Sequence, residues 1–143
     1  MKWVTRARPK TDRVACPWLI KRFIDPDAEI VYVRALDVLS TAATHQAKSF
    51  DAPGATYDHR GPRCTFEVLI DEFDLADDAG LRRLARVVHA ADIEADLETD
   101  PLGPGLLAIG LGSLDVESDD QVLLERELFV YDALYAWCKR YGS

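Results

Sequence analysis

The sequence predicts an α+β or mixed α/β domain, in which a small sheet packs against helices and the C-terminal half is mostly helical. Two short extended segments lie within the first 34 residues, with a helical pattern between them. From residue 65 onward, apolar residues recur mainly at helical spacing. A chain of 143 residues with 48% apolar residues is of the size that builds one hydrophobic core, so we expect a single domain over residues 1–143.

The first half of the chain alternates between strands and helices. Residues 2–7 predict a first strand, because their side chains alternate between two faces, and residues 29–34 (EIVYVR) predict a second, because they are β-branched and aromatic. Between them, Pro17 suits the first turn of a helix that ends at Asp25 and Pro26. The order strand, helix, strand indicates that helices cover the sheet.

The middle of the chain continues this pattern with shorter elements. Residues 36–47 are Ala-rich and predict a helix, and residues 49–60 predict two extended pieces around a Pro-Gly turn. Apolar residues of the segment that begins at Thr65 are spaced as in a short helix. Asp77 or Asp78 then caps a further helix. The apolar stripe of that helix consists of Leu81, Leu84, Ala85 and Val88.

The last third of the sequence predicts helices around a turn. Residues 100–105 (DPLGPG) form a turn cluster, and the apolar run 106–111 predicts a buried helix or strand. Residues 119–139 carry the strongest helical pattern of the chain. Two apolar rows cover much of the circumference of this helix, so we expect it to pack centrally or to be covered by a partner, which a homodimer through this C-terminal helix would supply.

Composition excludes several functional classes. The net charge of −8 does not suit a general nucleic-acid binder, whose affinity comes from many contacts of Lys and Arg with phosphates. Residues 1–24 nevertheless carry seven basic residues and one acidic residue, a local charge of +6 that either attracts a small anion or is simply a solvated edge. No secretory signal and no apolar run of ~20 residues is present, so we expect a cytoplasmic protein that does not enter the membrane.

The stretch 58–67, DHRGPRCTFE, gathers several groups that bind metals. Its Glu67 follows Cys64 by three residues, and His89 and Asp92 have the same spacing on a later helix, so each pair projects from one side of its helix. If these elements face each other, His59, Glu67, His89 and Asp92 meet, with Cys64 nearby. Two imidazoles and two carboxylates suit a divalent transition metal such as Fe, Mn or Zn. The alternative is a hydrogen-bonded network without a metal, in which His89 pairs with a carboxylate.

Two of the three cysteines suggest thiol chemistry. Cys16 precedes the predicted helix start at Pro17, where the helix dipole lowers a thiol pKa, and Arg13 lies within reach. Cys64 stands beside Arg63, whose guanidinium favours a thiolate, although the glycine-rich cradle of a phosphatase or rhodanese loop is missing. A thiol-dependent reductase or sulfurtransferase that uses Cys64 or Cys16 is therefore an alternative function. The plainer alternative is that Cys16 is a small buried residue.

Four stretches resemble the C-terminal domain of the bacterial chromate-resistance protein ChrB. They are KWVTRARPKTDRVACPWLIKRFIDP, DHRGPRCTFE, the helix ending HAAD, and YDALYAWC. The resemblance runs over essentially the whole chain, and its most specific part is DRxACPWLIxRFID from Asp12 to Asp25. It implies a role in chromate resistance, in which ChrB proteins are chromate-responsive regulators. The chain begins at the first strand of the domain, without the preceding region to which DNA-dependent regulation is assigned, so we do not expect direct nucleic-acid binding.

Three hypotheses follow from these observations. The first is a metal-binding domain of the chromate response that handles an oxyanion such as chromate, or reactive oxygen, with Arg13, Arg60 or Arg63 drawing in the anion. The second is the thiol enzyme. The third is a regulatory or interaction module without catalytic activity, which pairs through its C-terminal helix.

Overall fold

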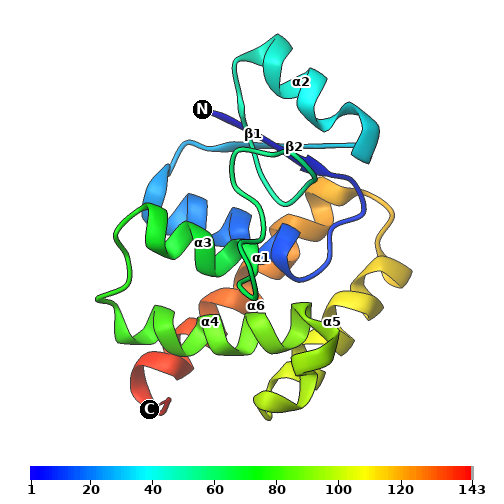
Figure 1. Ribbon diagram of the computed structural model, residues 1–143. Coiled ribbons are helices and arrows are strands. Elements are labelled where there is room, and N and C mark those ends of the chain that lie inside the picture. The colour runs from blue at the N-terminus through cyan, green and yellow to red at the C-terminus, as the bar shows by residue number, and fades with distance from the viewer. Residues whose placement is uncertain (143) are drawn as a thin grey trace.

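A small parallel sheet with helices on both faces organises the computed structural model, which describes residues 1–142 (Figure 1). Its strands are β1 (Lys2–Arg6), β2 (Glu29–Val33) and β3 (Lys48–Ser49), in the order β2-β1-β3. The central strand β1 pairs with both neighbours in parallel. The predicted fold class, a small sheet packed against helices with a mostly helical C-terminal half, is confirmed.

The two faces of β1 lie in different hydrophobic clusters. Trp3 is buried in the main core, among the helices that lie below the sheet in Figure 1. Val4 points to the other face, where it packs with Val38 and Ala42 of α2 (Val38–His45). A short 3-10 turn, η2 (Ala35–Asp37), leads into α2. The period-two alternation predicted from the sequence therefore places one side chain in each layer.

The first helix begins earlier than the sequence predicts. α1 (Asp12–Leu19) runs directly into the π-helical turn η1 (Ile20–Ile24), so Pro17 lies inside the helix and not at its start. Pro17 has no N–H to donate to the carbonyl four residues before it. The hydroxyl of Tyr32 donates to that carbonyl, the oxygen of Arg13, at 2.8 Å. A side chain from β2 thus replaces the missing backbone hydrogen bond.

The next elements agree closely with the predicted ones. Phe50 and Tyr57 form an isolated bridge on either side of a turn at Gly54, whose φ of 79° suits glycine. After α3 (Thr65–Glu72), Asp78 caps α4 (Ala79–Asp92) by accepting a hydrogen bond from the Leu81 N–H at 2.9 Å. The predicted stripe of α4 is buried throughout. It consists of Leu81, Leu84, Ala85 and Val88.

The last third of the chain is formed by η3 (Glu94–Thr99), α5 (Gly103–Val116) and α6 (Asp120–Arg140). The predicted turn cluster is shorter than expected, because α5 already begins at Gly103. The run 106–111 is helical but not fully buried, since the side chains of Ile109 and Leu111 are 43% and 49% exposed. No helix within residues 1–142 combines the length and the apolar character needed to cross a bilayer.

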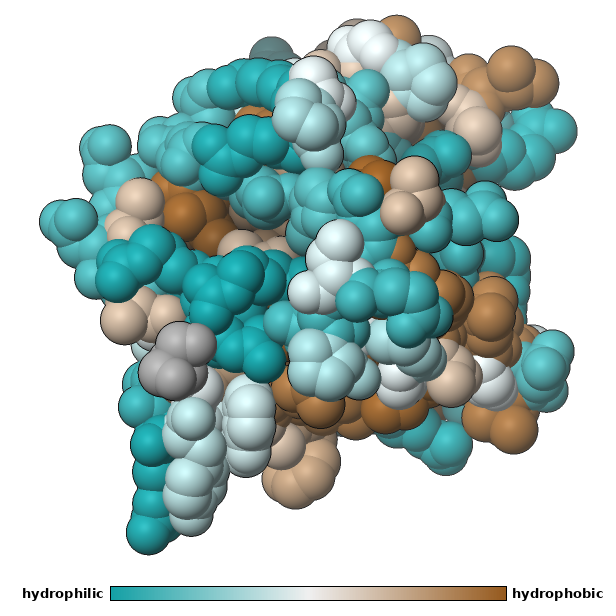
Figure 2. Space-filling model, turned by 60° about the horizontal axis from the view of Figure 1, so that its bottom comes forward, coloured by the Kyte–Doolittle hydropathy of each residue, from teal (hydrophilic) through white to brown (hydrophobic). Residues whose placement is uncertain are grey.

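An apolar groove of about 500 Å³ lies between α5 and α6. Its walls include Ile109 from α5 and Phe129 and Trp137 from α6, and Phe129 is 75% exposed. Figure 2, which turns the lower end of Figure 1 toward the viewer, shows apolar side chains gathered on this side of the molecule. One face of α6 packs in the core, while the other remains uncovered in the single chain. Homodimer formation through this helix stays a prediction.

Glu127 gives the fold a pH-dependent stability. Its side chain is buried on α6, and within residues 1–142 its Oε2 atom has no hydrogen-bond partner. Burial raises the pKa of Glu127 to about 7. Because the folded state binds this proton more tightly than the unfolded chain does, the associated stability is complete below about pH 4 and is lost as the pH rises through about 7.

We therefore expect Glu127→Gln to raise the free energy of unfolding by about 1–3 kcal/mol at about pH 8 and to change it little at about pH 5. Chemical denaturation at both pH values measures this difference. Glu125→Gln, which removes a carboxylate from an exposed position of the same helix, is the matched control. An equal effect of Glu127→Gln at both pH values would contradict the assignment.

Candidate metal centre

Polar side chains converge at the carboxyl edge of the sheet. β1 ends at Arg6 and leads to Asp12 at the start of α1, and β3 leads to Asp51 two residues after its end. Because the strands are parallel, both connections leave the sheet at the same edge, where ligands of open parallel sheets usually bind. His59 reaches this edge from the loop before α3, and Asp92 from the end of α4.

Asp12 joins α1 to α3. Its side chain is fully buried, and its two oxygens accept hydrogen bonds from the N–H groups of Thr65 at 2.9 Å and Phe66 at 3.1 Å. These are unpaired amides of the first turn of α3, so a residue 53 positions earlier in the chain satisfies them. Asp51 strengthens the joint by accepting a hydrogen bond from the Thr65 hydroxyl at 2.9 Å. Burial raises the pKa of Asp12, and the hydrogen bond with His59 opposes this shift.

Three carboxylates surround a single nitrogen of His59. Its Nε2 lies 3.4 Å from Asp12 Oδ2, 3.2 Å from Asp51 Oδ1 and 3.3 Å from Asp92 Oδ2. We call these four residues the His59 cluster. The hydrogen bonds with Asp12 and Asp51 raise the pKa of His59 to about 10. One imidazole N–H nevertheless cannot satisfy three carboxylates at once.

The carboxylates of the His59 cluster also oppose one another. Burial, followed by the charges of Asp12 and Asp51, raises the pKa of Asp92 to about 7. Two guanidiniums offset part of the negative charge, because Arg6 and Arg13 lie 3.4 and 3.6 Å from Asp51 Oδ2. Asp12, Asp92 and one nitrogen of His59 together form a set of atoms that can hold a metal ion.

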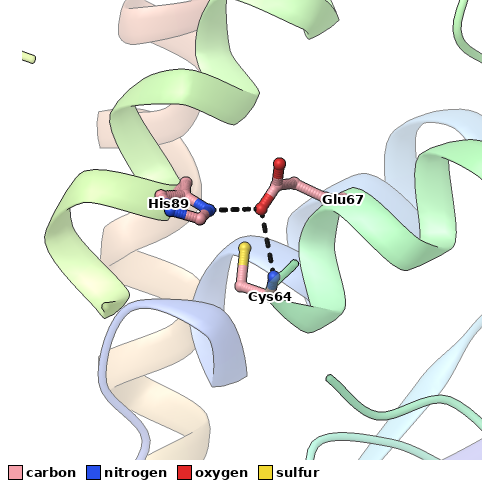
Figure 3. A group of neighbouring side chains, drawn as sticks. All are labelled: Cys64, Glu67 and His89. Carbon is pink, nitrogen blue, oxygen red and sulfur yellow. Dashed lines mark hydrogen bonds and ion pairs between the residues drawn. The ribbon is translucent and has the colours of Figure 1, made fainter. Parts of the chain in front are cut away.

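A second group lies beside the first, between α3 and α4 (Figure 3). Glu67 Oε1 is 2.5 Å from Nδ1 of His89 and also accepts a hydrogen bond from the N–H of Cys64 at 3.0 Å. The other ring nitrogen of His89, Nε2, lies 2.6 Å from Asp96 Oδ2. Although burial disfavours the charged ring, these two carboxylates raise the pKa of His89. We call Cys64, Glu67 and His89 the Cys64 group.

The four predicted ligands are thus brought together as two pairs. His59 meets Asp92, and Glu67 meets His89, but the pairs belong to neighbouring groups with different partners. The alternative expectation, in which His89 pairs with a carboxylate, also describes the contact with Glu67. Sequence reasoning missed three of the acidic partners. They are Asp12, Asp51 and Asp96.

The three predicted anion-binding arginines do not converge. Arg60 forms an ion pair with Glu72, and Arg63 forms one with Asp71, so these two guanidiniums are held by acidic residues of α3. Only Arg13 faces the His59 cluster, where it approaches Asp51. Of the three arginines predicted to draw in an anion, Arg13 is the one that lies beside the cluster, while Arg60 and Arg63 form local ion pairs with α3. Anion binding by any of them stays a prediction.

The cysteines are not activated as the sequence predicts. Cys16 lies in the interior of α1 and not at a helix start, so no unpaired amides face its sulfur. Its side chain and that of Cys64 are fully buried. Burial raises the pKa of both thiols, and the nearby carboxylate of Asp12 adds to the effect. Neither residue is a ready nucleophile, which corrects the expectation of a lowered thiol pKa.

Comparison with known proteins identifies the family. The profile of the family described as "ChrB, C-terminal domain" matches residues 3–138. The chain belongs to the ChrB C-terminal domain family. The curated "Protein ChrB" of Cupriavidus metallidurans is 38% identical over 134 residues, which cover 94% of this chain. The chain spans 40% of the length of that ChrB protein, and no solved structure matches it significantly.

The most specific part of the resemblance, from Asp12 to Asp25, contributes residues to the candidate metal centre. That stretch contains Asp12, which joins α1 to α3, and Arg13, which faces the His59 cluster. The most specific motif of the resemblance therefore lies at the wall of the candidate metal centre.

Proposed function

We propose that this ChrB C-terminal domain binds a divalent transition metal ion at the His59 cluster and takes part in the response to chromate. The observation that carries the proposal is the convergence of three carboxylates on one imidazole nitrogen, each at 3.2–3.4 Å. A divalent ion would offset two of these three negative charges and would accept a lone pair from each group. Oxygen donors with one imidazole suit Mn²⁺, Fe²⁺ or Zn²⁺.

The chromate role of the domain rests on the metal. Chromate is a dianion, and three carboxylates repel it when no cation lies between them. A bound divalent ion would reduce the charge of the three carboxylates from −3 to −1, and the guanidiniums of Arg6 and Arg13 beside Asp51 would bring the local charge to +1. Because the side chain of His59 is 38% exposed, an anion from solvent can approach this end of the cluster. The family resemblance to chromate-resistance proteins supports chromate as that anion.

The thiol alternative has weaker support. A reductase or sulfurtransferase needs an accessible thiolate, whereas Cys16 and Cys64 are buried and their thiol pKa values are raised.

We expect metal-free protein to bind one equivalent of Mn²⁺ or Zn²⁺ at the His59 cluster. His59→Ala and Asp92→Asn should each weaken this binding at least about tenfold, which corresponds to about 1.4 kcal/mol. Isothermal titration calorimetry measures the affinity. His45→Ala, which changes an exposed histidine on α2, is the matched control. Unchanged affinity in both His59→Ala and Asp92→Asn would refute the proposed site.

The pH dependence of metal affinity provides a further check on the same titrations. Metal binding requires a neutral imidazole and ionised carboxylates, so His59, whose pKa Asp12 and Asp51 raise to about 10, must lose its proton. Affinity should therefore rise by about tenfold per pH unit for each proton displaced, between about pH 6 and about pH 8. In His59→Ala this slope should be shallower.

Chromate binding should depend on the metal. Equilibrium dialysis of metal-loaded and metal-free protein against chromate should show at least about tenfold tighter binding by the loaded form, because only that form offers a net positive centre. Arg13→Gln should reduce the binding by the loaded protein, and Arg60→Gln, in which an arginine paired with Glu72 is changed, should leave it unaltered. Equal binding with and without metal would contradict this account.

A further inference from the structure

We propose that the Cys64 group is a second metal site, with a preference for Zn²⁺, that is separate from the His59 cluster. The two sites share the helix α4, which supplies Asp92 to the His59 cluster and His89 to the Cys64 group, but they share no ligand. The inference goes beyond the proposed function, because it assigns a thiolate-containing centre to residues that the first site does not use. It does not depend on metal binding at the His59 cluster.

The geometry of the Cys64 group is that of converging ligands. Cys64 is the residue before α3, Glu67 lies in the first turn of the same helix, and His89 comes from the facing helix α4. Their sulfur, carboxylate oxygen and ring nitrogen all lie within 4.8 Å of one another. Figure 3 shows the three side chains pointing into the same space between the helices.

The orientation of His89 indicates a ligand. Its Nε2 lies 2.6 Å from Asp96 Oδ2, so this nitrogen carries the proton that it donates to the carboxylate. Histidines that bind metals commonly donate their second N–H in this way, which fixes the ring and directs the other nitrogen at the ion. Nδ1 faces Glu67 Oε1 at 2.5 Å, a separation at which a proton lies between the two atoms. In the metal-bound protein, the cation would replace this proton, and Glu67 and His89 would move apart to admit ligand bonds of about 2.0–2.2 Å.

The sulfur of Cys64 determines which metal fits. Thiolate, imidazole and carboxylate together are a ligand set for Zn²⁺, which binds three protein ligands and leaves a fourth position open. The oxygen-rich His59 cluster suits harder ions better. Cys64 is fully buried, whereas the side chains of Glu67 and His89 are 18% and 19% exposed, so the open position faces outward along these two residues. Binding of Zn²⁺ releases the thiol proton and the proton between Glu67 and His89 to solvent.

Co²⁺ is the probe for this site, because a Co²⁺ ion bound by thiolate absorbs through sulfur-to-metal charge transfer. We expect this absorption when Co²⁺ is added to reduced, metal-free protein, and we expect Zn²⁺ to abolish it by displacement. Cys64→Ser should eliminate the band. Cys16→Ser and Cys138→Ser, which change the two other buried cysteines, should retain it.

Two further variants keep the test decisive if Cys64→Ser does not fold. Glu67→Gln retains an oxygen that accepts the Cys64 N–H, so α3 stays capped, but it should weaken Co²⁺ binding at least about tenfold. His59→Ala should leave the band intact, because it affects only the first site. Three results would each overturn the second site: no band in folded wild-type protein, a band that survives in folded Cys64→Ser, or unchanged Co²⁺ affinity in Glu67→Gln. None of these results would contradict metal binding at the His59 cluster.

Discussion

The buried carboxylate of Asp12 is the constraint on which the rest of the site depends. It closes the first turn of α3 with two backbone hydrogen bonds, and the positive end of the helix dipole stabilises its charge. These two hydrogen bonds fix where α3 begins, and therefore where Cys64 and the preceding loop with His59 must lie. The cost is a charge buried beside Asp51 and Asp92, which His59 and the nearby guanidiniums only partly compensate. A bound cation would offset the negative charge that these groups leave uncompensated.

One turn of α4 contributes to both candidate metal groups. His89 and Asp92 are three residues apart on the same side of the helix, yet His89 faces Glu67 and Asp92 faces His59. The groups differ in chemistry, since one is rich in oxygen and the other contains sulfur. The place of the His59 cluster at the sheet edge follows from the parallel order of β1 and β3.

Much of the fold could be predicted because local patterns decide it. The alternation in β1, the cap at Asp78 and the stripe of α4 each depend on neighbouring residues. The start of α1 could not be predicted, because the carbonyl that Pro17 leaves without a backbone donor accepts a hydrogen bond from the hydroxyl of Tyr32 on another strand. The same limit applies to the site. The spacing of Glu67 and His89 shows which face of its helix each occupies. Their acidic partners come from distant segments of the chain, and spacing within one helix does not show which of these segments it contacts.

The metal content of the protein tests the central claim most directly. Protein purified without nickel affinity chromatography and dialysed without chelator can be analysed for all first-row transition metals. The account predicts close to one equivalent or more of bound metal per chain, and a clear loss when Asp92 and His89 are both replaced. Less than about a tenth of an equivalent, unchanged by these replacements and by added metal, would show that the carboxylates and histidines form only a hydrogen-bonded network.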